Sequence, residues 1–416
     1  MTALPQLRRQ PGFRRFWVAS TVSDLGTRIS TVAIGVLVVV DLGGSAADVG
    51  LVQGATMLPY LAVGLFVGVL ADRIRRKPLL VATDLGRAVA LGCVPALWAL
   101  GWLDVPVLVA VMLVFGLLSV LNAAAHQSFL PRLVAREQLH RANVRLDQSD
   151  AVAQTSGPLV GGGLVAAIGA PVTILVDALS YAVSGVLTAL TPADDPVPER
   201  ERRSVVAELR EGVGWVYRHP TLRPLALGTH GWFLFHAVLN ATYVPYALLE
   251  LRLDAVGLGA TFALAGVGAL AGSSASERVG GLIGIPAVVT ACWLLEAVGF
   301  AVIALAGAHD GPVVVVLAAG GQLLYGLGMG LENPITLSYR QALTPDRLQG
   351  RMNATIRSFN RAMVVVGAPL GGLLADSAGL RTALWVGVAG IAATGVLLLV
   401  SGFRLATHDV GAPGGG

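Results

Sequence analysis

The sequence predicts an all-α polytopic membrane protein with twelve transmembrane helices and both termini in the cytoplasm. Of its 416 residues, 55% are hydrophobic and only 13% are charged, and the mean hydropathy is +0.72. One soluble core could not bury so much apolar surface. Two further observations, the spacing of the apolar runs and the alternation of arginine between loops, give the number of spans and the topology.

Apolar runs of membrane-spanning length recur along the whole chain. A hydrocarbon core about 30 Å thick requires roughly 20 apolar residues in a helix. The predicted spans are residues 14–41, 48–70, 79–100, 104–127, 145–168, 171–191, 222–248, 255–276, 284–307, 312–334, 354–375 and 381–402. Twelve spans place the two termini on the same side.

The connecting loops alternate in positive charge. The loops after spans two, four, six and ten contain Arg73, Arg75, Arg76 and Lys77, then Arg132, Arg136 and Arg141, then Arg200, Arg202, Arg203, Arg210 and Arg218, then Arg340, Arg347 and Arg351. The opposite loops contain little beyond Arg252 and Arg381. Arginine and lysine accumulate on the cytoplasmic side of membrane proteins, so both termini are predicted to be cytoplasmic.

The longest connection divides the chain near its middle. We expect an N-terminal six-helix half at 1–192, a cytoplasmic linker at 193–220, a C-terminal six-helix half at 221–403 and a flexible tail at 404–416. Val205, Leu209, Val213 and Val216 recur at helical spacing in the linker. This pattern favours an interfacial helix, and a solvated connector is the alternative.

The two halves show a weak repeat at an offset of about 205 to 211 residues. The matched segments are Ala71–Ile74 with Ser276–Val279, Arg141 and Asn143 with Arg351 and Asn353, and Pro158–Leu159 with Pro369–Leu370. These matches fall in corresponding loops and spans. They therefore indicate two pseudo-symmetric halves of six helices each.

Several classes of function are disfavoured. The net charge of +4 comes from cations beside membrane spans, where topology and anionic lipid explain them, so we expect no nucleic-acid partner. Cys93 and Cys292 lie far apart inside apolar runs, and we expect no metal and no cofactor. The sequence has no H-E-x-x-H or G-x-S-x-G motif of an enzyme, and its single lysine, Lys77, is not in a phosphate-binding loop.

Five segments resemble the major facilitator superfamily, and the resemblance covers essentially the whole chain. Residues 68–77 resemble that family's loop motif after the second helix, with Arg75 where glycine is usual. Residues 153–162 resemble the fifth-helix signature of antiporters, with Gly157, Pro158, Gly161 and Gly162. Residues 13–17, 177–180 and 218–220 resemble the drug and siderophore exporter branch. The family's fourth-helix arginine is absent from residues 111–120.

The resemblance implies a transporter of the bacterial cytoplasmic membrane. We expect a monomer, surrounded by membrane lipid, that exports a small amphipathic molecule of the drug, antibiotic or siderophore type. It would work by alternating access between two six-helix halves, in exchange for protons. The glycines of the fifth span would then form a seam between moving halves, or else only a tightly packed helix pair. A non-transporting receptor or scaffold with a transporter fold is the alternative function.

Ionisable side chains at membrane depth are the coupling candidates, because each requires a partner, a water-filled cavity or a proton. Asp24 and Arg28 lie four residues apart in the first span and are expected to pair, with a static ion pair as the alternative. Glu332 and His236 are further candidates. Glu296 lies on the ninth span, which is peripheral in the resembling fold, and is expected to be protonated or turned inward.

The resembling fold also implies where a substrate and a latch would lie. Spans one, four, seven and ten line its central cavity, which would gather Asn122, His126, His230, Asn240, Gln322, Tyr325 and Asn333. Span two packs against span eleven there, and span five against span eight. A cytoplasmic latch would therefore use Gly68, Asp72, Arg73, Arg76, Lys77, Asp147, Asp150, Arg278, Arg357 and Arg361. Loop-end charges that contact only water and headgroups are the alternative.

Overall fold

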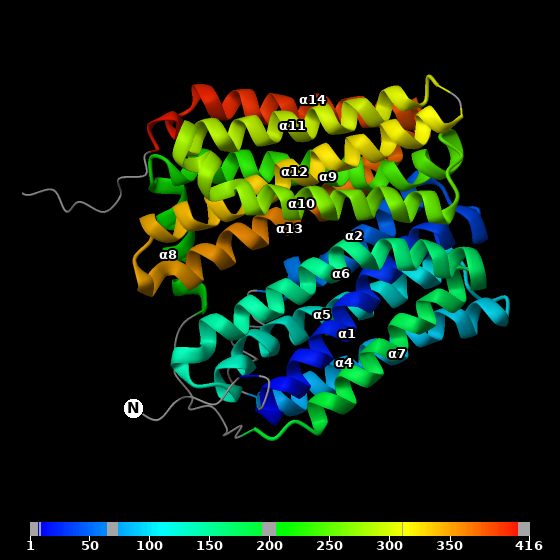
Figure 1. The fold of residues 1–416 in the computed structure, drawn as a ribbon, viewed down its shortest axis with the longest axis horizontal. Coiled ribbons are helices and arrows are strands. Elements are labelled where there is room, and N and C mark those ends of the chain that lie inside the picture. Colours follow the sequence, from blue (N-terminus) through cyan, green and yellow to red (C-terminus); the bar gives the residue numbers. More distant parts are fainter. Residues whose placement is uncertain (1–6, 8–9, 65–73, 194–204, 310, 407–416) are drawn as a thin grey trace, which may run out of the picture. The chain divides into compact units, whose positions relative to one another are not determined.

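The computed structural model describes residues 7, 10–64, 74–193, 205–309 and 311–406 of the chain (Figure 1). Within these residues every regular element is a helix. The helices before the central linker are α1 (Pro11–Val36), α2 (Ala46–Ala62), α4 (Arg76–Ala99), α5 (Val105–Leu133), α6 (Leu139–Ile168) and α7 (Ala170–Ala189). The linker contains α8 (Val205–Arg218), and after it come α9 (Leu222–Pro245), α10 (Ala255–Ile283), α11 (Ile285–Ala306), α12 (Pro312–Leu343), α13 (Asp346–Ala378) and α14 (Leu380–Val400).

Eleven helices of the described chain are long and apolar enough to cross a membrane. The helix α2 begins at the predicted second span, and residues 65–73 of that span and its loop lie outside the described residues. The all-helical membrane fold is therefore confirmed, whereas the twelfth span stays a prediction. The linker is helical at α8, and the interfacial position of that helix stays a prediction.

Several helices extend beyond the apolar runs. Helix α5 continues to Leu133, α6 begins at Leu139, and α13 begins at Asp346. These extra turns lie at the arginine-rich ends of the spans. Hydropathy detects only the part of a helix in contact with hydrocarbon, and a helix continues into the headgroup region because its backbone hydrogen bonds remain favourable there.

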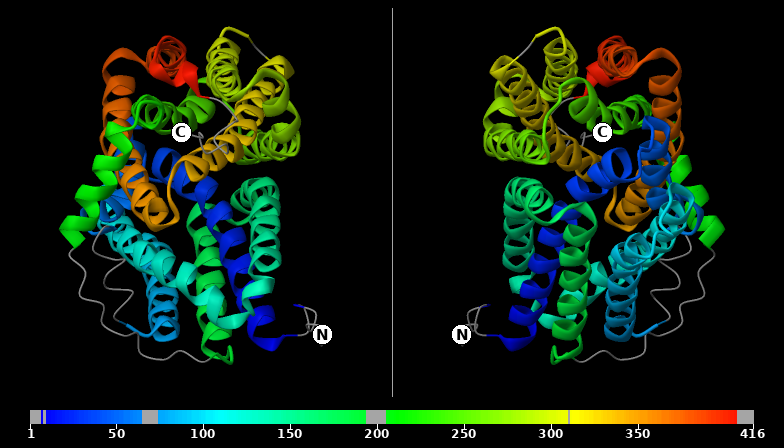
Figure 2. Two further views of the ribbon diagram at one scale, coloured as in Figure 1. Left: turned by 90° about the vertical axis from the view of Figure 1, so that its left-hand side faces the viewer. Right: turned by 90° about the vertical axis from the view of Figure 1, so that its right-hand side faces the viewer.

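The contacts divide the chain into two units. Unit 1 comprises Met1–Gly43, Ala55–Arg202 and Asp254–Gly259, and unit 2 comprises Gly44–Gly54, Arg203–Leu253 and Ala260–Gly416. In unit 1, α1 packs against α6 and α7, and α4 packs against α5 and α7. In unit 2, α9 packs against α13 and α14, α11 packs against α12 and α14, and α8 runs beside α13 (Figure 2).

Glycine allows α10 and α12 of unit 2 to pack closely. A Cβ at Gly268 or Gly272 of α10 would overlap the backbone of α12, and a Cβ at Gly326 or Gly330 of α12 would overlap the backbone of α10. Each pair is spaced by four residues, so its members lie on one helix face. Close packing therefore accounts for these glycines of the tenth span.

The repeat predicted from sequence recurs in local backbone geometry. Helices α1 and α9 both end in one π-helical turn, at Leu37–Asp41 and Tyr246–Glu250. The residues that follow these turns with positive φ are Gly43, at 60°, and Arg252, at 53°. An arginine in this left-handed region is unfavourable relative to glycine, so the second half keeps the same chain reversal at some cost in strain.

The first turns of α2 and α10 are close-packed on another helix. In unit 2, a Cβ at Gly50 of α2 would overlap the carbonyl group of Ala368 in α13. In unit 1, a Cβ at Gly259 of α10 would overlap the carbonyl oxygen of Pro158 in α6. These are the pairings that the resemblance implied, span two with span eleven and span five with span eight. Both contacts lie at the helix ends opposite the arginine-rich loops.

Candidate functional site

Unit 1 contains an ion pair near the middle of its first span. Arg28 of α1 donates through Nη2 to Oδ1 of Asp150 in α6 at 3.0 Å. The expected pairing of Arg28 with Asp24 is therefore wrong. The reason is the packing of α1 on α6: the Arg28 side chain lies where a Cβ of Gly157 would be, so its guanidinium reaches α6.

Asp24 is left without an ion pair in the part of the chain that the structure describes. Its side chain is half-buried, one helical turn before Arg28, and it lies within reach of the charges of Arg28, Asp150 and Arg87. Two carboxylates thus surround one guanidinium on α1 and α6. This cluster carries one negative charge when both acids are ionised, and binding one proton neutralises it.

In a second charged group of unit 1, the carboxylate has several hydrogen-bond donors. Asp84 of α4 accepts hydrogen bonds from Arg87, from Nδ2 of Asn122 at 3.0 Å and from the Ser184 hydroxyl at 2.8 Å. The Arg87 guanidinium lies 4.2 Å from the centre of the Tyr181 ring. Sequence reasoning missed Asp84 and Arg87, although two opposite charges three residues apart in an apolar run are a visible signal.

Two predicted cavity residues of unit 1 are engaged in helix packing. Asn122 of α5 is 8% exposed and donates to Asp84 and to the Thr83 hydroxyl. His126, one turn later, hydrogen-bonds Ser20 of α1 at 2.8 Å through Nε2. Their polar atoms therefore link α5 to α4 and to α1 within the unit.

Unit 2 brings together an aromatic and acidic cluster. His236 of α9 stacks on Trp232, with ring centroids 4.3 Å apart and planes 11° apart, and on Tyr325 of α12 at 5.4 Å. Its Nε2 lies 2.6 Å from Asn240 Nδ2. Three of the predicted residues, His236, Asn240 and Tyr325, are thus neighbours. Trp232 was missed, although it precedes His236 by one helical turn.

Glu296 completes this cluster from α11. Its side chain is 1% exposed, and Oε2 accepts a hydrogen bond from the indole nitrogen of Trp232 at 2.7 Å. Gly328 of α12 leaves room for it, because a Cβ there would lie 2.7 Å from Glu296 Cγ. Of the two expectations for this acid, the structure therefore shows the inward-turned one.

Among the other predicted residues of unit 2, Glu332 lies within reach of the charge of Glu296 in the cluster, whereas His230 has its partners elsewhere. His230 hydrogen-bonds Tyr217 of α8 and Asn360 of α13, each at 2.7 Å. Gln322 is 2% exposed, Glu332 is half-buried, and Asn333 is exposed on α12. No group of three or more potential metal ligands occurs among the residues described.

The predicted latch is described only in part. Gly68, Asp72 and Arg73 lie outside the described residues. Arg76 is buried at the start of α4, and Asp150 is engaged with Arg28. The structure describes the other predicted latch residues without testing their role; they are Lys77, Asp147, Arg278, Arg357 and Arg361. The latch stays a prediction.

Comparison with known proteins identifies the family. The model of the transmembrane secretion effector family matches residues 2–411. The multidrug efflux pump Tap of Mycobacterium tuberculosis is 29% identical over 394 residues, covering 92% of this chain and 91% of the relative. The enterobactin exporter EntS of Salmonella typhi is 28% identical over 411 residues, covering 95% and 94%.

Solved structures show the same fold at low identity. The nucleoside transporter NupG superimposes with a TM-score of 0.74 at 10% identity, over 93% of this chain and 98% of that chain. A bacterial homologue of the iron transporter ferroportin gives a TM-score of 0.72 at 16% identity, over 93% and 97%. The chain is thus a multi-pass transporter of the bacterial inner membrane and not an enzyme. It belongs to the transmembrane secretion effector family, within the drug and siderophore exporters of the major facilitator superfamily.

Proposed function

We propose that this protein exports a small amphipathic molecule across the cytoplasmic membrane in exchange for protons, by alternating access. The relatives named as a multidrug efflux pump and a siderophore exporter support the direction of transport and the substrate class. The observation that carries the proton exchange is the cluster of Asp24, Arg28 and Asp150, in which two acids share one base.

An unequal number of acids and bases suits coupling for an electrostatic reason. A net charge at membrane depth is unfavourable, so the cluster gains from a bound proton or from another cation. Asp24 is the acid that has no ion pair in the described chain, and we assign the exchanged proton to it. Asp84 is unsuited, because its carboxylate is already matched by Arg87 and two further donors.

Unit 2 supplies the chemistry for an amphipathic substrate. The stacked rings of Trp232, His236 and Tyr325 offer flat apolar faces, and Glu296 and Asn240 offer polar groups beside them. His236 Nδ1 is buried and has no hydrogen-bond partner in the described residues. A substrate with an aromatic body and a polar group would match this arrangement.

The function is tested with purified protein in sealed liposomes that contain an amphipathic dye, under an imposed pH gradient. We expect the wild type to move dye against its concentration gradient. Asp24→Asn removes the titratable group with little change of volume, and we expect it to abolish uphill movement while dye exchange without a gradient persists. Asp41→Asn, at the exposed end of the same span, is the matched control. Uphill movement by Asp24→Asn at the wild-type rate would contradict the assignment, and no dye movement by the wild type would favour a receptor or scaffold.

A further inference from the structure

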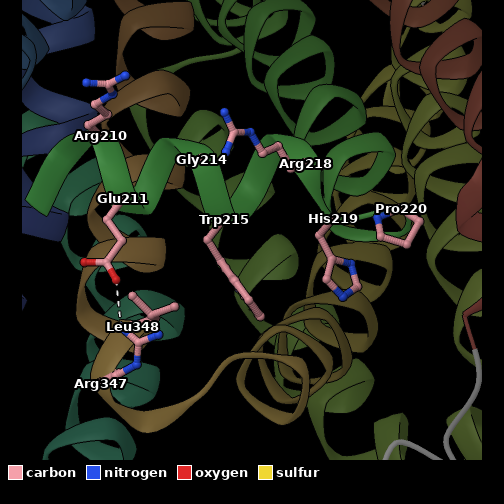
Figure 3. A pocket seen from close by; sticks show the side chains of 9 residues that line it. All are labelled: Arg210, Glu211, Gly214, Trp215, Arg218, His219, Pro220, Arg347 and Leu348. Carbon is pink, nitrogen blue, oxygen red and sulfur yellow. Dashed lines mark hydrogen bonds and ion pairs between the residues drawn. The ribbon is translucent and has the colours of Figure 1, made fainter.

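A cavity of about 670 Å³ lies in unit 2, away from the polar clusters of the spans. Helix α8 and the residues just after it form one wall, and Arg347 and Leu348 at the start of α13 form the other (Figure 3). Its volume falls within the range of sites for small ligands. The positive-inside rule places both walls on the cytoplasmic side, because the loops after spans six and ten contain arginine clusters.

Arginine outnumbers acid among the residues that line the cavity. Arg210, Arg218 and Arg347 line it, against the single carboxylate of Glu211. Glu211 is already engaged, since its two oxygens accept from Arg347 and from Arg351. Arg210 and Arg218 are exposed and have no ion pair in the described chain. Two guanidinium groups are therefore available to an anion.

These two arginines lie on one edge of α8 with open space between them. Arg210, Gly214 and Arg218 are spaced by four residues, so they share a helix face, and the two arginines are about 12 Å apart along the axis. A Cβ at Gly214 would meet no atom within 4 Å. In Figure 3 both arginines point to one side of α8, and Glu211 and Trp215 point to the other. Gly214 thus leaves room for a headgroup flanked by two cations.

The opposite edge of α8 is fixed to the spans. The indole nitrogen of Trp215 donates to the Thr344 hydroxyl at 3.2 Å. Val216 is fully buried in a small core with Met352 and Ile356 of α13. A Cβ at Gly212 would lie 2.8 Å from the carbonyl oxygen of Arg351. The arginine edge is therefore presented on a helix whose position is set by α13.

His219 does not add to the positive charge. Its Nδ1 accepts hydrogen bonds from the backbone nitrogens of Thr221 and Leu222, each at 3.3 Å. Burial lowers the pKa of His219 below its usual value. The imidazole is therefore neutral at pH 7, and the anion is attracted by arginine alone.

We propose that the edge of α8 formed by Arg210, Gly214 and Arg218, at the rim of this cavity, binds the phosphate headgroup of an anionic phospholipid from the cytoplasmic leaflet, with the two arginines as its ligands. Guanidinium groups form strong, bidentate hydrogen bonds with phosphate oxygens. An amphipathic helix joined directly to a membrane span lies at the depth of lipid phosphates, and the cytoplasmic leaflet is the anionic one. Trp215 is a residue type enriched at this depth.

The proposal is tested by lipid binding rather than by transport. Purified protein is placed in nanodiscs of phosphatidylcholine with and without phosphatidylglycerol, and bound lipid is measured by native mass spectrometry. We expect the wild type to retain phosphatidylglycerol, and Arg210→Ala/Arg218→Ala to retain it at least tenfold less. Arg132→Ala/Arg404→Ala removes the same charge from exposed positions in other cytoplasmic segments and is the matched control.

A second pair of variants keeps both arginines. Gly214→Glu places a carboxylate in the open space, and we expect it to lose phosphatidylglycerol. Gly214→Ala adds only a methyl group and is expected to bind as the wild type does. Equal retention of lipid by the wild type and both arginine pairs would overturn the proposal. Displacement of the lipid by millimolar inorganic phosphate would also overturn it, since the site would then serve a soluble anion.

Discussion

Two acidic side chains of unit 1 differ in the number of their partners. Asp84 is 3% exposed and accepts from Arg87, Asn122 and Ser184. A buried carboxylate with matched donors holds its helices together and has little reason to change its protonation state. Asp24 has no ion pair in the described chain, and the nearby charges of Arg28, Arg87 and Asp150 act on it only through space. Partner number, rather than burial, thus distinguishes the structural acid from the coupling candidate.

The identity of the partner of Arg28 leads to a prediction for Asp150. If the pair of Arg28 and Asp150 sets the field at Asp24, Asp150→Asn should slow proton-driven efflux about as much as Arg28→Gln does, at least tenfold. Asp41→Asn, at the exposed end of the first span, is the control. Both ion-pair side chains are partly exposed, at 35% and 48%, so the loss of stability should stay below about 1 kcal/mol. Initial efflux rates in liposomes, with thermal unfolding alongside, test this. An Asp150→Asn protein that transports like the control would show that the pair is passive.

At this scale the sequence predicted which residues are charged but not how they pair. Asp24 and Arg28 are four residues apart, the spacing of helical ion pairs. The actual partner of Arg28 depends on Gly157 of α6, which allows α1 to approach. Such a contact is set by the fold and not by spacing along one helix. For the same reason the hydrogen bond of Glu296 to Trp232 on another helix could not be read from the chain.

At the scale of elements, His219 caps a transmembrane helix. Thr221 and Leu222 at the N-terminus of α9 donate their backbone N–H groups to His219 Nδ1. Only the neutral imidazole can accept there. The N-cap residue, Thr221, makes no side-chain capping bond, and a ring nitrogen two residues earlier replaces the usual side-chain oxygen as acceptor. Protonation of Nδ1 would leave both backbone groups without this acceptor.

The cap predicts that the stability of the folded protein depends on pH. Burial holds the pKa of folded His219 below that of an unfolded chain, about 6.5. Above pH 6.5 the imidazole is neutral in both states, so its protonation does not affect the free energy of unfolding. As the pH falls through 6.5 toward the folded pKa, the unfolded chain binds the proton first, and the folded state loses stability. Histidine NMR titration should show His219 titrating below the value of about 6.5 for an unfolded chain. The acid destabilisation should be smaller in His219→Asn, whose amide oxygen accepts at all pH values. An unshifted His219 titration would contradict the cap.

The element boundaries show what hydropathy can and cannot detect. The predicted spans 79–100 and 171–191 correspond closely to α4 and α7. The prediction for the eleventh span began at residue 354, but α13 begins at Asp346. Its first two turns contain arginine and lie beyond the hydrocarbon, where the helical periodicity continues without an apolar run. The same turns bear Arg347 and Leu348, so the part of α13 that hydropathy missed is the part that lines the cavity.

At the scale of the whole molecule, the first turn of α2 is bound to the last turn of α13. Asp376 accepts from the backbone nitrogens of Ala46 and Ala47 at 3.1 and 3.2 Å. A carboxylate at a helix N-terminus is stabilised by the unpaired N–H groups and by the helix dipole. A Cβ at Gly372 would also overlap the backbone of these residues. By the predicted topology this contact faces away from the cytoplasm, at the opposite end of spans two and eleven from the predicted latch at Asp72.

Substitutions at the two ends of the pair of α2 and α13 should therefore shift the conformational equilibrium in opposite directions. In alternating access, each contact stabilises the state in which its own end is closed. Asp376→Ala removes the acceptor for two N–H groups, and we expect it to populate a state in which the first turn of α2 leaves α13. Asp72→Asn should populate the state that opens at the cytoplasmic end instead. Each change removes interactions worth about 1 to 2 kcal/mol, so a minor state should grow by roughly fivefold to thirtyfold.

Distances between spin labels measure both effects. Leu51 of α2 and Leu373 of α13 are exposed and report the end bound by Asp376, in a background of Cys93→Ala/Cys292→Ala. We expect a longer distance to appear in Asp376→Ala and the wild-type distance to gain population in Asp72→Asn. Asp254→Ala is the control, because Asp254 caps only its own helix, α10, through Gly257. Identical distributions in wild type and Asp376→Ala would mean that glycine packing alone holds this seam. Movement in the same direction in both variants would contradict the exchange of one closed end for the other.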